Sequence, residues 1–486
     1  MEIEISKIVL DEYIYPRSNK SNKTIETYAE AIKAGAQFPP ITVQRVINFN
    51  QLDEAILIID GLHRLEAHLS VGSKTIEAVE YDTQPLDYET NKTALLLESA
   101  ECNTKHGDRL SDGDKKFKAR QIAEIDKDIT EQAIANKFGV AQPTINSWIS
   151  DIRARQKATR DSKIYRLSLL GWTQDEIAEA MGMTQPRVLQ IINNIRYDNI
   201  YNLVETHDTE YAADYYKIDL ALAWAIRMRG QEDRKRFKVH DEDGEKAGSP
   251  LDPLRTYDVW NWSDCDKRFG DDWPGRIPAQ LVAHVLYYFT RKGDVVLDPM
   301  AGGGVVPDTC LLFERKCQAF DINVREARPE IKKHYWDIDN MTWPAMKKAP
   351  DLIFFDPPYY KKMDDDYILK AGDSVPLSSL PKDRYLEFYK MFFELAFENT
   401  KANTRLAFLN ADWRDYQNKA AIDETPENDI TMIDYADLLR DAGWVITHII
   451  DCPLSSQQMR ATTVKSYQDN RTLGVLRRTL LVCKHG

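Results

Sequence analysis

Cysteine is scarce in this sequence, and its placement excludes two kinds of protein. The six cysteines of the 486 residues are scattered and form no C-x-x-C pair. Structural zinc sites and disulfide frameworks are both recognised by characteristic cysteine spacings. The sequence therefore predicts no metal site and no disulfide scaffold.

Long apolar segments are missing as well. No stretch is long enough to span a bilayer, and residues 1–10 lack the apolar core of a signal peptide. The hydrophobic content of 43% suits a globular chain. We therefore expect a cytoplasmic protein with no membrane partner.

The length of the chain exceeds that of one ordinary domain and is sufficient for three. The pattern of elements predicts an α/β multidomain protein. We expect a domain at 1–98, a helical region at 99–232, a polar linker at 233–253 and a second domain at 254–486.

The most informative motif is Asp356-Pro357-Pro358-Tyr359, which follows the apolar run 352–355. An exocyclic amine of adenine or cytosine is a poor nucleophile, because its lone pair is delocalised into the ring. A carboxylate and a fixed main-chain carbonyl can draw that lone pair back onto nitrogen. Asp356 offers the first, Pro357 offers the second, and two successive prolines hold the turn. Tyr359 adds a flat face on which an extruded base can stack.

A glycine-rich loop upstream supplies the second part of a site. A short buried strand at 294–297 leads into the loop 298–304, which ends in three glycines, and a helix is expected at 307–315. Glycines allow close approach of a ligand, and the helix start presents free N–H groups. The next strand, 316–320, ends at Asp321, where a doubly wound fold places an acid for ribose hydroxyls. The loop lacks the G-x-G-x-x-G spacing typical of dinucleotide-binding sites, so the sequence gives weaker support to a dinucleotide as the ligand.

Residues 255–486 resemble the amino-methyltransferase family of DNA methylases that use S-adenosylmethionine. The resemblance implies a Rossmann-like domain with a mostly parallel sheet, with Met300 in place of the family's usual phenylalanine. It implies that Asp298 binds the amino group of the methionine moiety, Asp321 the ribose hydroxyls and Asp337 the adenine. The implied cofactor residues are Pro278, Asp298, Pro299, Met300, Ala301, Gly302, Gly303, Gly304, Asp321 and Asp337, and the implied catalytic residues are Asp356, Pro357, Pro358 and Tyr359.

The order of these motifs and the rest of this half agree with the resemblance. The segment 275–289 resembles the family's element that covers the methionine end, and its place before the loop gives the γ-like order. Helices are expected at 385–398 and 435–442, and strands at 404–409, 444–452 and 479–483, the last two as an antiparallel pair. No proline–cysteine dipeptide suits ring-carbon methylation, which needs a thiolate nucleophile.

The N-terminal part has a different signature. Gly61 and Arg64, in the run 58–67, resemble the Gly-x-x-Arg turn of the ParB/sulfiredoxin superfamily, which implies an α+β domain and phosphate binding at a helix start. Leu62 stands where sulfiredoxin has its cysteine, which excludes a sulfinic acid reductase. His63 replaces the second arginine of the partition proteins' nucleotide switch, so the sequence does not predict nucleotide hydrolysis.

A repeat in the middle of the chain points to DNA. Residues 130–149 and 173–192 share a helix-turn-helix pattern, with Gly139 and Gly182 at the turns. The second helix of such a unit normally enters the major groove. The candidate base contacts are Gln142, Thr144, Asn146, Gln185, Arg187 and Gln190.

The stretch between the two repeats is basic, although the whole chain carries a formal net charge of −13. Its basic residues are Arg153, Arg155, Lys157, Arg160, Lys163 and Arg166. Such a run is often only a solvated face. Here it lies where phosphates would be if the repeats bind DNA.

Together these patterns predict a DNA methyltransferase of prokaryotic or phage origin that acts on a flipped base in double-stranded DNA. Adenine N6 is favoured over cytosine N4, because relatives with Asp first in the motif act more often on adenine. Two alternatives remain: an RNA or protein methyltransferase, and a ParB-like regulator whose methylase fold is not catalytic. The sequence leaves open whether the chain forms a homodimer.

Overall fold

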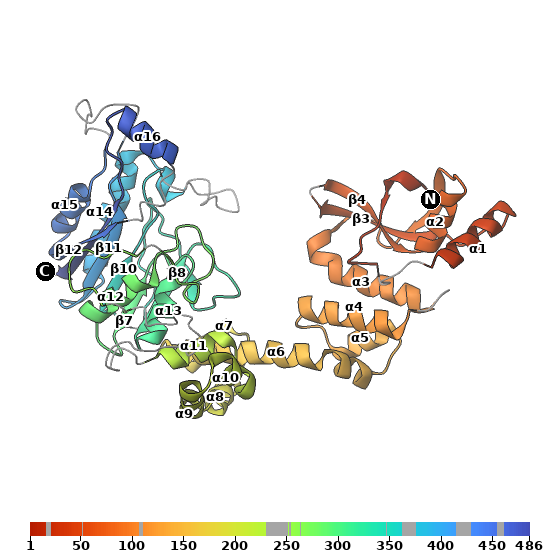
Figure 1. The fold of residues 1–486 in the computed structure, drawn as a ribbon, viewed down its shortest axis with the longest axis horizontal. Coiled ribbons are helices and arrows are strands. Elements are labelled where there is room, and N and C mark those ends of the chain that lie inside the picture. The colour runs from red at the N-terminus through yellow and green to blue at the C-terminus, as the bar shows by residue number, and fades with distance from the viewer. Residues whose placement is uncertain are drawn as a thin grey trace. The chain divides into compact units, whose positions relative to one another are not determined.

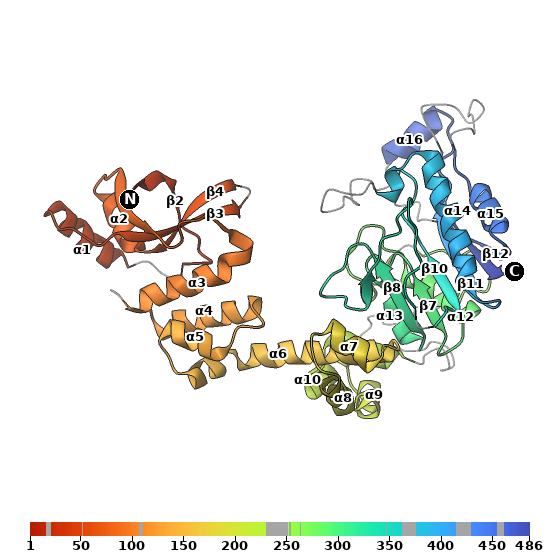
Figure 2. The same cartoon turned by 180° about the vertical axis from the view of Figure 1, so that it is seen from behind.

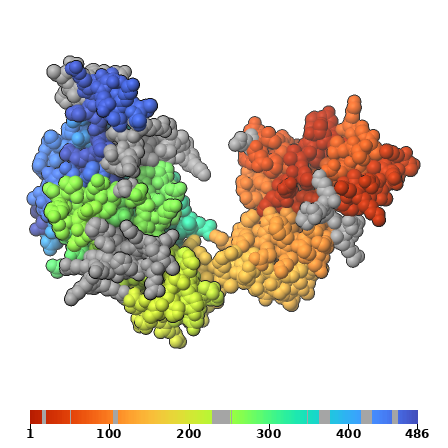
Figure 3. Space-filling model, viewed as in Figure 1, coloured from red at the N-terminus to blue at the C-terminus, as the bar shows by residue number. Residues whose placement is uncertain are grey.

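The computed structural model of the chain describes residues 1–15, 21–50, 52–105, 110–229, 251, 254–262, 264–346, 348–361, 376–414, 429–453 and 461–486. They form two compact units, 1–158 and 159–486 (Figures 1 and 3). Within these residues no helix has both the length and the apolar character needed to cross a membrane.

The division between the units falls inside the helical region expected at 99–232. The expected boundaries at 98 and 253 remain predictions. The linker expected at 233–253 lies, apart from residue 251, outside the described residues.

The first unit begins with a six-stranded sheet in the order β1-β5-β3-β4-β2, with β6 paired to β3. The strands are β1 (Glu2–Glu4), β2 (Ile8–Val9), β3 (Ile41–Phe49), β4 (Leu52–Asp60), β5 (Thr75–Glu80) and β6 (Leu86–Asp87), and a 3-10 turn, η1 (Ile5–Lys7), separates the first two. Helices α1 (Asn22–Lys33), α2 (Leu62–Ser70) and α3 (Tyr88–Lys105) accompany it. The pairing of β3 with β4 is antiparallel, whereas β3 with β5 is parallel, so this is a mixed α+β domain.

Three further helices of this unit pack on α3. They are α4 (Asp112–Ile125), α5 (Glu131–Phe138) and α6 (Gln142–Leu169), the last of which continues past residue 158. Thr130 caps α5 by accepting a hydrogen bond from the Ala133 N–H, and Gly139 ends α5 with a φ of +61°. Their apolar faces, which include Phe138 and Ile149, share one buried cluster with α3.

The second copy of the repeat forms another pair of helices joined by a turn. Helices α7 (Gln174–Ala180) and α8 (Gln185–Asn194) are followed by α9 (Tyr197–Thr206), α10 (Thr209–Tyr216) and α11 (Leu220–Met228). Thr173 and Glu176 cap the start of α7 reciprocally, the arrangement called a capping box. The turn again contains a glycine with positive φ, Gly182 at +61°.

The α/β part of the second unit is built on a seven-stranded sheet in the order β12-β13-β11-β10-β7-β8-β9 (Figure 2). The strands are β7 (Val295–Asp298), β8 (Lys316–Asp321), β9 (Ile331–Lys333), β10 (Leu352–Phe355), β11 (Arg405–Ala411), β12 (Trp444–Pro453) and β13 (Arg477–His485). All neighbouring pairs from β9 to β11 are parallel, and β13 is antiparallel to both β11 and β12. This is the doubly wound Rossmann order with one antiparallel strand inserted near an edge.

Helices cover both faces of this sheet. They are α12 (Ala279–Phe289), α13 (Val305–Leu312), α14 (Lys382–Glu398) and α15 (Met432–Asp441), with a short 3-10 turn η2 (Leu377–Ser379). A further helix, α16 (Ala461–Asp469), belongs to neither buried layer. Along β10, Leu352 and Phe354 pack with α12 and α13, whereas Ile353 and Phe355 pack with α14 and α15. Because both faces are covered, the strand is apolar at every position.

The sequence predicted most of these elements. The strands expected at 294–297, 316–320 and 404–409 correspond to β7, β8 and β11, and the expected antiparallel pair is formed by β12 and β13. The sequence did not predict α16 within the polar loop that joins them. This helix has no buried residue, so it carries no apolar periodicity that could reveal it.

The helices after residue 159 share a core with the α/β part. Leu170 and Ala225 belong to the same buried cluster as α12 and α13. The Leu170 carbonyl accepts a hydrogen bond from the Cys317 N–H at 3.2 Å, and Arg229 Nη1 donates to the Leu311 carbonyl at 2.7 Å. The end of α6 and helix α11 are therefore packed onto the α/β domain, whereas α7 and α8 belong to a separate buried cluster.

A buried charge cluster joins the same parts. Asp308, in the first turn of α13, accepts hydrogen bonds from Arg328 at 3.0 Å, from Arg166 at 3.0 Å and from the Gly270 N–H at 2.8 Å. Arg328 Nε also lies 2.9 Å from a Glu330 oxygen, at an angle outside that of a hydrogen bond. Burial opposes ionisation of Asp308, but the two arginines outweigh it and lower the pKa of its carboxyl.

Replacing Arg328 by Met should destabilise the second unit by about 3 to 5 kcal/mol, because Asp308 and Glu330 would lose a buried charge partner. Urea unfolding followed by tryptophan fluorescence measures this, since every tryptophan except Trp148 lies in that unit. The control is Arg440→Met, which breaks an exposed pair with Asp437 and should change stability by less than about 1 kcal/mol. Equal effects of the two substitutions would contradict the prediction.

Candidate functional site

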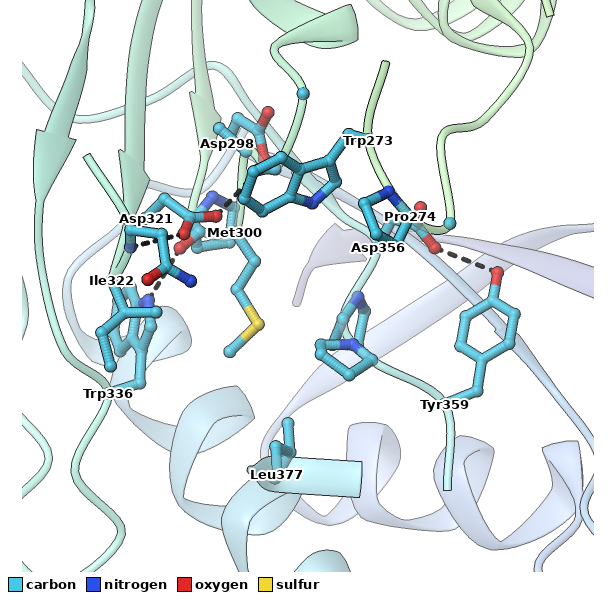
Figure 4. A pocket seen from close by; sticks show the side chains of 18 of the residues that line it. Trp273, Pro274, Asp298, Met300, Asp321, Ile322, Trp336, Asp356, Tyr359 and Leu377 are labelled. Carbon is cyan, nitrogen blue, oxygen red and sulfur yellow. Dashed lines mark hydrogen bonds between the residues drawn. The ribbon is translucent and has the colours of Figure 1, made fainter. Parts of the chain in front are cut away.

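A cavity of about 1030 Å³ lies at the carboxyl ends of β7, β8 and β10. Figure 4 shows residues from the loops that follow these three strands around it. Strands β7 and β10 are neighbours at the point where the strand order reverses, which is where doubly wound folds bind ligands. The cavity therefore occupies the expected place for a ligand.

The glycine loop forms one wall of the cavity and is held from several sides. The Gly302 N–H donates to an Asp321 oxygen at 2.8 Å. A Cβ on Gly303 would meet Trp273 Cβ at 2.9 Å, and a Cβ on Gly304 would meet an Arg328 nitrogen at 2.0 Å. The glycines thus make room for Trp273 and Arg328, two side chains whose presence at this loop could not be predicted from the sequence. Their role toward a cofactor remains a prediction.

Two acidic side chains face each other across this wall. Asp298 ends β7 with 3% of its surface exposed, and Asp321 ends β8. Burial, and then the charge of Asp321, raise the pKa of Asp298 well above its usual range. Burial also raises the pKa of Asp321, although the N–H groups of Asn323 and Gly302 act against it. A cationic or hydrogen-bond-donating ligand would favour the ionised form of both.

The floor of the cavity is partly apolar. Trp336 donates from Nε1 to the Pro299 carbonyl at 2.8 Å, which fixes its ring beside Ile322 and Met300 (Figure 4). Asp337 also lines the cavity and accepts a hydrogen bond from the Asp339 N–H at 3.0 Å. Further lining residues include Pro278, Pro299, Ala301, Trp273 and Leu377. The predicted cofactor residues from Pro278 to Asp337 therefore come together, except that Gly304 is not among the lining residues.

The Asp-Pro-Pro-Tyr turn forms the opposite wall. Tyr359 donates its hydroxyl hydrogen to an Asp356 oxygen at 3.0 Å (Figure 4). The Pro358 carbonyl accepts a hydrogen bond from the buried Tyr385 at 3.1 Å. Among the described residues none donates to the Pro357 carbonyl. Asp356 and Pro357 thus line the same cavity as Asp298, and their action as a pair of acceptors remains a prediction.

The Asp356 carboxyl has a perturbed pKa. Burial raises it to about 6, while the charge of Arg478 and the Tyr359 hydroxyl act in the opposite direction. The side chain is partly exposed by surface area because one side faces the cavity. Arg478, on β13, lines the cavity and was not among the predicted site residues. It lies far along the chain from Asp356, so no local pattern connects the two.

The predicted phosphate site of the first unit is occupied by internal contacts. Gly61 has a φ of +97° at the start of α2, and a Cβ there would meet Ile41 at 2.7 Å. Arg64 donates to an Asp60 oxygen at 2.8 Å and to the Pro39 and Pro40 carbonyls at 2.6 and 2.8 Å. Binding of phosphate by Arg64 remains a prediction, and it would require these contacts to be exchanged.

The predicted base contacts fall into two groups. Gln142, Thr144 and Asn146 lie at the start of α6 in the first unit, whereas Gln185, Arg187 and Gln190 lie on α8 in the second. All are exposed except Thr144, which is partly buried. The structure does not bring the two groups together within one unit.

Much of the basic stretch between the repeats is engaged inside the protein. Arg153 donates to the Lys127 and Ile129 carbonyls, Arg155 pairs with Glu124, Arg160 pairs with Asp161, and Arg166 pairs with Asp308. These contacts give the run a structural role. Its attraction for phosphates is correspondingly weaker than the sequence indicates.

No protein-family model matches the chain. A curated relative, the transcriptional regulator NovG of Streptomyces niveus, is 30% identical over 131 residues, which cover 27% of this chain. The chain spans only 36% of that relative's length. This likeness does not place the chain in a family.

Several solved structures are similar to parts of the chain. TrmN from Thermus thermophilus is 16% identical, with 43% of this chain and 50% of that chain covered and a TM-score of 0.26. A TehB-like SAM-dependent methyltransferase from Corynebacterium glutamicum is 11% identical, with 42% and 86% covered and a TM-score of 0.25. ParB from Caulobacter crescentus, complexed to the centromeric parS site, is 13% identical, with 40% and 100% covered and a TM-score of 0.23.

Replacing Asp356 by Asn should stabilise the protein at high pH. The folded pKa of about 6 exceeds the unfolded value, so the folded state loses stability as pH rises from about 4 to about 6, and the loss persists above that. Asn cannot ionise, so the substitution should raise the free energy of unfolding by about 3 kcal/mol at pH 8, and by about half as much at pH 5. Thermal unfolding at both pH values measures this, with the exposed Asp437→Asn as control. A gain of equal size at pH 5 and pH 8 would refute the assignment.

Proposed function

We propose that the chain is an S-adenosylmethionine-dependent methyltransferase that methylates an exocyclic amine of a base in double-stranded DNA. Adenine N6 is favoured over cytosine N4 because the motif begins with Asp356. The observation that carries the proposal is the shared cavity: the two acceptors of Asp356 and Pro357 lie on one wall, and the acids Asp298 and Asp321 lie on another. One wall suits an amine to be activated, and the other suits a polar, positively charged donor.

The residues present fit S-adenosylmethionine. Asp298 is nearly fully buried and its carboxyl has a raised pKa. The ammonium group of the methionine moiety would stabilise the ionised form of this carboxyl. Asp321 would hold ribose hydroxyls, and Trp336 with Ile322 offers an apolar surface for an adenine ring. When bound, the cofactor supplies an electrophilic methyl group.

The protein's own part in the reaction is to position the amine. The Asp356 carboxylate and the Pro357 carbonyl would accept the two amine hydrogens, which directs the nitrogen lone pair out of the ring plane. Asp356 must be ionised to do this, so activity should fall below about pH 6. No general base is needed before methyl transfer, because the amine becomes acidic only as it is alkylated. Positioning supplies much of the rate.

The two helix pairs support DNA as the substrate. Each has the helix–turn–helix length, with exposed polar side chains at the start of its second helix. The pair α7–α8 belongs to the same compact unit as the α/β domain, and Glu176 on α7 lies 3.6 Å from Lys332 on β9, so DNA bound to α8 would be held at a set distance from Asp356. The target base would leave the duplex to reach the cavity, where the Tyr359 ring can stack on it.

Replacing Asp356 by Ala should reduce methyl transfer by at least about a hundredfold, because one of the two amine acceptors is removed. Binding of S-adenosylmethionine, measured by calorimetry, should stay within a few fold of the wild type. Transfer of labelled methyl groups to DNA measures the activity, and Asp437→Ala is the control. An active Asp356→Ala protein would refute the catalytic assignment.

DNA from cells that express the protein should contain methylated adenine at a defined sequence, mapped by sequencing that detects modified bases. Methylated cytosine N4 would correct the base, and unmodified DNA with methylated RNA or protein would overturn the substrate class. On the mapped site, Arg187→Ala should weaken binding about tenfold or more if this arginine reads a base. As a control, replacing Arg440, which lies on α15, by Ala should leave DNA binding unchanged.

A further inference from the structure

Arg478 is a buried cation beside the Asp-Pro-Pro-Tyr turn. It lies on β13, has 8% of its surface exposed and lines the cavity. It lines the same cavity as Tyr359, whose hydroxyl donates to Asp356 at 3.0 Å, and its charge lowers the pKa of that hydroxyl against the effect of burial. The Arg478 Nε atom is buried and has no hydrogen-bond partner.

The burial of this side chain is not explained by an ion pair. Among the described residues no carboxylate forms a salt bridge with Arg478. Burying a guanidinium without a paired carboxylate is costly, and packing alone could be achieved by an apolar residue of similar size. The position therefore points to a use for the positive charge inside the cavity.

The groups around Asp356 show what that use is. Asp298 on β7 is an acid and disfavours a second negative charge nearby. Cys452 on β12 is a thiol whose pKa burial raises to about 12, so it is neutral. Tyr359 on the same turn is neutral as well, because burial raises its pKa well above the usual range. Among the described groups that act on Asp356, Arg478 is the one charged group that favours its ionised form, and the hydrogen bond from the Tyr359 hydroxyl acts in the same direction.

We propose that Arg478 is a positioning residue that keeps Asp356 ionised inside the cavity and fixes the Tyr359 ring against it. In this role Arg478 does not touch the reacting atoms. It acts through Asp356, which needs its negative charge to accept a hydrogen bond from the substrate amine at neutral pH. The nature of that amine rests on the proposed function, but the effect of Arg478 on Asp356 does not.

The test compares two substitutions in the full chain. Arg478→Gln keeps a hydrogen-bond donor near Tyr359 but removes the charge, and Arg478→Lys keeps the charge. The carboxyl titration is followed by NMR on protein with 13C-labelled Asp side chains, where the Asp356 signal is identified by its absence in Asp356→Asn. Arg478→Gln should raise the Asp356 midpoint by about one to three pH units, and Arg478→Lys by less than about one unit.

The neighbouring Arg477 provides a matched control. It lies on the same strand with 54% of its side chain exposed, and its nearest carboxylate is 3.6 Å away on Asp451. Arg477→Gln should leave the Asp356 titration unchanged. The acid limb of the methylation rate against pH should move up with the NMR midpoint in Arg478→Gln. Its activity at pH 7 should then fall by about twofold for a rise of one unit and about a hundredfold for a rise of three, and should recover when the pH is raised above the new midpoint.

Each outcome decides the proposal. An unchanged Asp356 midpoint in Arg478→Gln, or an equal loss of activity at every pH, would overturn it. If Arg478→Gln does not fold, Arg478→Lys decides, and a rise of two units or more there would overturn it. If the wild type methylates no DNA, the proposed function fails, while the NMR titration still tests Arg478.

Discussion

The parallel pairing of β7 with β10 is the constraint on which the candidate site depends. These strands are separated in sequence by β8 and β9, yet Val296 pairs with Leu352 and Leu297 with Ile353. Parallel strands end at the same edge of a sheet, so Asp298 and Asp356 are brought to one cavity. The sheet can hold this pairing because each strand is apolar on both faces and helices cover each of them. The polar groups of the site are thereby confined to the edge.

Charges are buried at two places around that edge, with different consequences. Asp308 is surrounded by Arg166, Arg328 and a main-chain N–H, so its charge is compensated and it ties the start of α13 to α6. Asp298 and Asp356 are compensated less, and burial raises the pKa of each. Fully compensated charges suit a structural joint. Incompletely compensated ones are typical of groups that must bind or activate a ligand.

Most of the α/β domain could be predicted from the sequence because its signals are local. Apolar runs mark β7, β8, β10 and β11, and a glycine or proline stands where several of them end. Contacts between residues far apart in the sequence could not be predicted. Trp273 in front of Gly303 and Arg478 beside Asp356 have no signature of their own. Arg64 and Arg166 were predicted to bind phosphate, but each is paired with a carboxylate. The partner of Arg64 is Asp60, four residues earlier, and the partner of Arg166 is Asp308, which is distant in the sequence.

The sequence by itself determined the elements, the motif order and the acids that end the strands, because periodicity and turn chemistry depend on neighbouring residues. Only the tertiary structure decided which side chains share a cavity and which charges are already paired. It also divided the helical region, since α4 and α5 pack on α3 in the first unit, whereas α7 to α11 belong to the second unit, where Ala225 of α11 joins the core of the α/β domain. The physical reason is that packing and charge compensation act through space, between residues that the chain places far apart.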